Sequence, residues 1–224
     1  MSTENEKHKV DYKKIFDNID KGIIACNFDF RELTGVYDGL FNYLKEKAGT
    51  SAGFTGLAEY IILNTIFLYL KQKLNIQFKP EAKTKDVNFF ISTDKRILIT
   101  HSISINEEMG KVVVKKFGKN IIWSFSKKSP DIVIFNSTDS GYSPEAIIQI
   151  KLYAVSSGII DGEVNKIKKM LSGVKNNKPF CCIIFFHKLS PKIENKLKKD
   201  FNFVITPDNP NFIEMLQKIE MRLH

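Results

Sequence analysis

Three polar side chains stand at or inside apolar strands, where they need a chemical or structural reason. Asp131 precedes a run of four apolar residues, and Gln149 and Lys151 alternate with isoleucines in a second run, EAIIQIKLY. Because alternate side chains of a strand share one face, Gln149 and Lys151 point the same way, about 7 Å apart. The turn-rich stretch NSTDSGYSP between the two runs predicts an antiparallel pair, which would place Asp131 beside them.

An acid, an amide oxygen and an amine on one sheet face suit a hard divalent cation, which prefers oxygen ligands. Asp131 can supply a charged ligand, Gln149 a neutral one, and the Ile150 carbonyl a third. Lys151 would then contact the attacking water or a phosphate and lower the cost of charge there. Glu59, in a predominantly apolar helix, needs a partner and could add a second carboxylate.

Each of these residues also has a purely structural interpretation. Asp131 could cap the start of a strand or pair with Lys127 or Lys128. Lys151 could extend from a sheet edge into water along its aliphatic stem. Glu59 could be an acid near a helix N-terminus, where the helix dipole favours negative charge.

The elements that must position these residues follow a helical, then β-rich, then alternating order. Apolar periodicity predicts helices over residues 12–21, 31–47, 55–74, 161–171, 191–201 and 211–223. Runs of β-branched and aromatic residues predict strands over 87–92, 96–105, 111–117, 120–125, 131–135, 145–153, 179–186 and 201–206. This order predicts an α/β protein with a sheet of mixed direction. We expect a polar tail and helical N-terminal region (1–53) and an α/β core (54–224), with one globular unit overall.

Over roughly residues 54–186 the chain resembles the PD-(D/E)XK nuclease superfamily. The pattern of that superfamily is a helix bearing Glu, a strand opening with Pro-Asp, a strand bearing Asp/Glu-x-Lys, then a helix and a further strand. The matching segments are GLAEYIILN, SPDIVIF, IIQIKLY, DGEVNKIKKML and PFCCIIFF.

The resemblance implies a restriction-endonuclease-like α/β/α core that uses Mg²⁺, with Mn²⁺ as a substitute, to cleave phosphodiesters. Asp131, Gln149 and Lys151 would take the metal and catalytic roles, with Glu59 as the helical acid. Such enzymes act as homodimers in which each active site cuts one strand. The resemblance therefore predicts a type II restriction-type endonuclease acting on double-stranded DNA, and the N-terminal region would supply dimer or DNA contacts.

The chain departs from this pattern at Gln149, where the superfamily has Asp or Glu. The amide removes one negative charge, which should weaken metal binding because the charge of the ligands sets affinity. A catalytically inactive, nuclease-like DNA-binding module is therefore the alternative. A third possibility is an unrelated α/β protein whose basic charge reflects composition alone.

The lysines around these motifs suggest a polyanionic partner. Of the net charge of +9, residues 161–200 carry +6, because ten lysines there face four acids. Lys166 and Lys169 share a helix face just beyond the proposed site, and Lys127 and Lys128 precede Asp131. We expect these four to contact DNA phosphates, although solvated helix faces are the usual alternative.

Composition narrows the cellular setting. In 224 residues, 43% hydrophobic content predicts a globular protein rather than a disordered chain. Three cysteines, two of them adjacent in an apolar run, predict buried thiols and no disulfide framework. The polar N-terminus lacks a signal-peptide core, and no apolar run is long enough to span a bilayer. We expect a cytoplasmic protein without membrane contacts.

Overall fold

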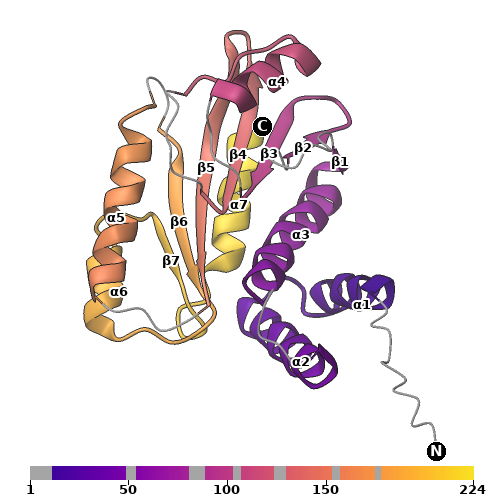
Figure 1. Cartoon of the computed structure of the whole chain (residues 1–224), viewed down its shortest axis with the longest axis vertical. Coiled ribbons are helices and arrows are strands. Elements are labelled where there is room, and N and C mark those ends of the chain that lie inside the picture. Colours follow the sequence, from indigo (N-terminus) through magenta and orange to yellow (C-terminus); the bar gives the residue numbers. More distant parts are fainter. Residues whose placement is uncertain are drawn as a thin grey trace, which may run out of the picture.

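The computed structural model describes residues 12–48, 54–80, 89–102, 107–123, 130–152, 157–174 and 178–224 (Figure 1). This described part contains seven helices and one open sheet of seven strands, so the protein is of the α/β class. The helices are α1 (Tyr12–Ala25), α2 (Phe30–Ala48), α3 (Phe54–Leu74), α4 (Glu107–Phe117), α5 (Ser157–Leu171), α6 (Pro191–Leu197) and α7 (Phe212–Leu223). The strands are β1 (Phe78–Pro80), β2 (Phe89–Ser92), β3 (Ile97–His101), β4 (Ile132–Thr138), β5 (Gly141–Lys151), β6 (Phe180–Phe185) and β7 (Phe203–Ile205).

The sheet has the mixed direction expected from the sequence. Its strands lie in chain order, and neighbours from β1 to β5 run antiparallel. The pairs β5–β6 and β6–β7 are parallel, because α5 and α6 carry the chain back before each of these strands begins. The β4–β5 hairpin turns through two residues, 139 and 140.

Helices cover both faces of the sheet and create two apolar cores. On one face, α3 and α7 pack against the strands and build the first core together with α1 and α2, and α4, α5 and α6 cover the other face (Figure 1). Successive side chains of β6 point to opposite faces of the sheet, so Cys182 lies in the first core and the adjacent Cys181 in the second. The N-terminal helices share the first core, where Phe30 of α2 contacts Phe186 and Phe212 with ring centroids 5.5 Å apart.

The segment 111–117 was expected to be a strand and is instead most of helix α4. Its three consecutive valines suggested a strand, but the helix buries Met109 and Val113, four residues apart, in the second core. Glu107 and Glu108 form the first turn of α4, where the helix dipole favours acids.

Three other element predictions need correction. The expected strand 120–125 contributes a single bridge, Ile121 to Tyr142, and residues 124–125 lie outside the described ranges. Strand β1 was not predicted, because three residues are too few to show a period. Helix α6 ends at Leu197, four residues earlier than expected.

A bulge in β5 changes the direction of Glu145. The β4–β5 register shifts between Ile134 and Phe135, which pair with Ala146 and Pro144, so Glu145 is the extra residue. On an unbroken strand Glu145 would share the face of Gln149. It instead binds Arg222 of α7, with Nη1 and Oε2 3.3 Å apart, on the side of the first core.

We expect Arg222→Met to lower the free energy of unfolding by about 2–3 kcal/mol. The substitution leaves the buried Glu145 carboxylate without its cationic partner, and this cost exceeds the contribution of a surface pair. Urea denaturation would measure the loss. The double variant Arg222→Met, Glu145→Gln should recover most of it, and a double variant as unstable as the single one would contradict the assignment.

Candidate functional site

The candidate site forms where β4 and β5 separate. The last antiparallel partners are Ile132 and Ile148, and the next residue of the β4 side is Asp131. Its Oδ2 accepts a hydrogen bond from the Ile150 main-chain N–H at 2.6 Å, and its carbonyl accepts one from Ser102 at 2.8 Å. The half-buried carboxylate therefore replaces the strand partner that Ile150 has lost, so the capping role considered above exists in the fold.

Gln149 lies on the second face of the sheet and is fully buried. Its Oε1 accepts a hydrogen bond from Lys166 Nζ of α5 at 2.7 Å, and its Nε2 donates to the Ile148 carbonyl at 3.4 Å. Lys166 was expected among the phosphate contacts, and the structure places it against the proposed metal ligand. Lys169, three residues later, is exposed.

Glu163 of α5 is a member of this cluster that sequence reasoning missed. Its Oε1 lies 3.1 Å from Lys151 Nζ, and its Oε2 lies 4.0 Å from Lys166 Nζ. All three side chains are largely buried, with exposed fractions of 16–21%. The available signal was the i,i+3 spacing of Glu163 and Lys166, which puts both on one helix face.

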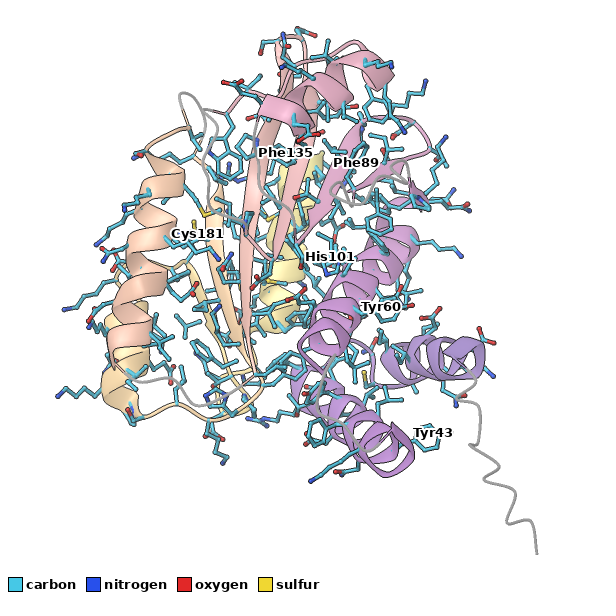
Figure 2. The ribbon with its side chains drawn as sticks, in the orientation of Figure 1. Tyr43, Tyr60, Phe89, His101, Phe135 and Cys181 are labelled. Carbon is cyan, nitrogen blue, oxygen red and sulfur yellow. The ribbon has the colours of Figure 1, made fainter. Side chains whose placement is uncertain are left out.

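Glu59 reaches the same region from the second turn of α3. Its Oε2 lies 3.0 Å from His101 Nε2 at the end of β3 and accepts a hydrogen bond from Ser102 Oγ. Figure 2 shows His101 between β3 and α3. Burial opposes ionisation of Glu59, but the hydrogen bonds from His101 and Ser102, with the nearby charge of Lys151, lower its pKa.

The pKa of Asp131 moves in the opposite direction. Burial raises it, and the charges of Lys151 and Lys166 and the Ile150 hydrogen bond compensate only in part. The charge of Glu59 raises it further. The structure thus brings Asp131, Lys151 and Glu59 into one electrostatic neighbourhood, since the charge of Lys151 acts on both carboxylates. Gln149 is connected to them through Lys166, whose charge also acts on Asp131.

The oxygen donors of this cluster fit a hard cation with a low ligand charge. The Lys151 carbonyl accepts a hydrogen bond from the main-chain N–H of Phe186, the residue after β6, so the preceding carbonyl, that of Ile150, faces the side of Asp131. The candidate ligands are thus one carboxylate, one carbonyl and one amide, and the amide oxygen is bound by Lys166. Across the described ranges no three His, Cys, Asp or Glu side chains form a metal-binding group. Because the charge of the ligands sets affinity, we expect weak divalent-cation binding.

A further observation concerns the second carboxylate oxygen of Glu163. Glu163 Oε2 is buried and has no hydrogen-bond partner among the residues that the structure describes. A buried carboxylate oxygen without a donor is costly, and nearby positive charge reduces that cost. Lys166 Nζ, 4.0 Å from this oxygen, supplies such a charge without a hydrogen bond.

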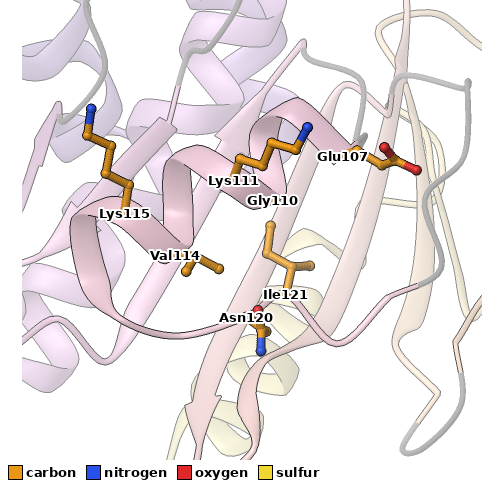
Figure 3. Close-up of a pocket in the computed structure, with 7 residues that line it drawn as sticks. All are labelled: Glu107, Gly110, Lys111, Val114, Lys115, Asn120 and Ile121. Carbon is orange, nitrogen blue, oxygen red and sulfur yellow. The ribbon is translucent and has the colours of Figure 1, made fainter.

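The lysines outside this cluster have different surroundings. Lys127 and Lys128 lie outside the described residues. Lys111 and Lys115 line a pocket of about 560 Å³ between α4 and residues 120–121 (Figure 3). Residue 121 pairs with Tyr142 near the start of β5, whereas the candidate site lies at its end, roughly 30 Å away. This pocket is therefore separate from the candidate site around Asp131 and Gln149.

Comparisons with known proteins do not identify a family. No family model, no curated protein and no solved structure matches this chain. No helix within the described ranges is long and apolar enough to cross a membrane.

We expect Asp131→Asn to make the protein more stable at pH 7. The folded-state pKa of Asp131 is raised, so its ionisation costs stability as the pH rises through the unfolded value near 4 and then the higher folded value. Asn keeps an oxygen for the Ile150 N–H and carries no charge. Urea denaturation from pH 3 to 8 should show a gain at neutral pH that disappears below about pH 4.

The matched control for this measurement is Asp139→Asn, in the exposed β4–β5 turn. It should match wild type at every pH. An Asp131→Asn variant that is less stable than wild type at pH 7 would show that the ionised carboxylate stabilises the fold.

Proposed function

We propose that this chain is a Mg²⁺-dependent endonuclease that hydrolyses phosphodiester bonds of double-stranded DNA, as type II restriction enzymes do. The observation that carries the proposal is the convergence of Asp131, Gln149 and Lys151 where β4 and β5 separate, with Glu59 in electrostatic range. A carboxylate, neutral oxygens and a lysine at one point of a sheet suit phosphoryl chemistry assisted by a metal ion.

The order of elements supports the proposal. Helix α3 carries Glu59, strands β3, β4 and β5 form an antiparallel meander, and α5 leads into β6, which is parallel to β5. This order resembles the restriction-endonuclease-like core described above, with Pro130-Asp131 directly before β4 and Gln149-x-Lys151 ending β5. Helices lie on both faces of the sheet, as in an α/β/α core.

Each residue has a separate task in this proposal. Asp131, Gln149 Oε1 and the Ile150 carbonyl would hold Mg²⁺, and Mn²⁺ would be accepted by the same oxygens. Bound there, the ion supplies Lewis acidity to the phosphate and acidifies a water ligand. Lys151, held at 3.1 Å by Glu163, offers a positive charge to the phosphate oxygens as negative charge develops.

Glu59 acts as the second acid of the proposed site. The hydrogen bonds of His101 and Ser102 favour its ionised form, so it adds negative charge near Lys151 and Asp131 at neutral pH. This charge compensates in part for the neutral amide of Gln149.

The test is incubation of the purified full chain with supercoiled plasmid and MgCl₂, followed by gel electrophoresis. We expect nicked or linear plasmid with Mg²⁺ and intact plasmid with EDTA. A homodimer, measured by analytical ultracentrifugation, is part of the same proposal because one active site would cut each strand.

An inactive DNA-binding module is the second candidate, and one observation favours it. Gln149 is neutral and its oxygen is already bound by Lys166. Such a module would bind duplex DNA in EDTA and leave plasmid intact with Mg²⁺. If DNA affinity is negligible at physiological salt, both the enzyme and the module are wrong, and the basic charge reflects composition.

A further inference from the structure

We infer that Lys166 is an internal cation that competes with the metal ion for Gln149, and that Glu163 accepts it when the metal binds. This inference rests on the proposed function, because it concerns the same ligands. It begins from the hydrogen bond of 2.7 Å between Lys166 Nζ and Gln149 Oε1. Gln149 is fully buried, so its oxygen cannot turn to water for another partner.

The ammonium group holds the amide oxygen that the ion would need, and it carries charge of the same sign. Lys166 and Lys151 both act on Asp131, and each of their charges lowers the pKa of that carboxylate. A divalent cation entering beside Asp131 would be repelled by two ammonium groups. Metal binding therefore requires that Lys166 move away from Gln149.

Glu163 offers the place to which Lys166 can move. Its Oε2 is buried without a hydrogen-bond partner in the described part of the chain and lies 4.0 Å from Lys166 Nζ. A displacement of about 1 Å would bring the two groups to the distance of a charge-assisted hydrogen bond. The flexible lysine stem permits this change without movement of α5.

The consequence is that a higher concentration of metal ion is needed to occupy the site, because Lys166 competes for Gln149. When Lys166 donates to Gln149, its ammonium group supplies the positive charge of the metal-free site. When Lys166 pairs with Glu163 instead, the amide oxygen of Gln149 is free to bind the ion. Lys166 is thus a positioning residue that determines metal affinity, whereas Lys169 on the same helix is exposed.

The test is isothermal titration calorimetry of the full chain with MgCl₂ and MnCl₂ in the absence of DNA. Lys166→Met should bind either metal about tenfold more tightly, the effect of removing one positive charge about 5 Å from a divalent ion in a water-like dielectric. Lys166→Gln has no charge and should behave in the same way, which protects the test against misfolding of one variant. Lys166→Arg, which keeps the charge, and Lys169→Met should both match wild type.

Glu163→Gln tests the second half of the inference. Without the carboxylate, Lys166 loses this charged acceptor, so metal affinity should fall by about tenfold. Unchanged affinity in Glu163→Gln would refute Glu163 as the acceptor, and unchanged affinity in both neutral Lys166 variants would refute the whole inference. If wild type binds metal and cleaves plasmid while these variants equal it, only the inference fails. If neither wild type nor Lys166→Met binds metal, the inference and the proposed enzyme both fail.

Discussion

Replacing Asp131 with Asn is expected to lower the rate of DNA cleavage by about 10³-fold, which corresponds to about 4 kcal/mol of activation free energy. Asp131 is the one charged oxygen donor beside the neutral oxygens of Gln149 and Ile150. Its loss removes most of the attraction for a divalent ion, because ligand charge sets affinity for hard cations. Plasmid cleavage under single-turnover conditions over a range of MgCl₂ concentrations would measure the effect.

The same variant should fold well, which separates chemistry from stability. The amide oxygen of the substituted side chain would still accept the hydrogen bond of the Ile150 N–H, and we expect the free energy of unfolding to rise at pH 7. A protein that is more stable yet inactive indicates a charge kept for function at a cost in stability. The control Asp139→Asn should cleave at the wild-type rate. If Asp131→Asn keeps more than a tenth of the wild-type activity, the proposed site is wrong.

Replacing Gly141 with Ala is expected to lower the free energy of unfolding by about 3–5 kcal/mol. Gly141 opens β5 with φ of +140°, a region that is essentially restricted to glycine. A Cβ at this position would overlap the Asn120 carbonyl oxygen and touch the Ile122 side chain. That carbonyl accepts the Tyr142 N–H at 2.7 Å, so the backbone cannot withdraw without losing the bond.

The matched control is Gly39→Ala in α2, where an added Cβ meets nothing within 4 Å. Alanine favours a helix interior over glycine, so this variant should be more stable than wild type by about 0.5–1 kcal/mol. Urea denaturation of both variants would give changes of opposite sign. A Gly141→Ala protein as stable as wild type would contradict the close approach of residue 120 to the hairpin.

The sequence predicted local elements wherever one periodicity was clear. The apolar stretch of α3 and the alternation of β5 lead directly to a buried helix and a two-faced strand. The adjacent Cys181 and Cys182 were expected to be buried thiols and are buried. Helix α4 was misassigned because its valines favour strands, and only the burial of Met109 and Val113 against the second core decides for a helix.

Some features of the candidate site could likewise be predicted from the sequence, and others could not. That Gln149 and Lys151 share a face follows from the two-residue period of any strand, and Pro130-Asp131 before an apolar run is visible in the sequence. The partners of these residues are not visible in the sequence, because Lys166 and Glu163 contact Gln149 and Lys151 only after α5 crosses back over the sheet. The bulge that moves Glu145 to Arg222 is likewise a property of the β4–β5 register.

The sequence by itself thus determined which side chains could do chemistry and on which face of their own strand each stands, because backbone geometry sets those relations over a few residues. The tertiary structure decided which charges neutralise one another. Ion pairs and hydrogen bonds act over a few ångströms, and the residues that come so close, such as Glu59 and His101 or Gln149 and Lys166, are brought together by the packing of distant elements.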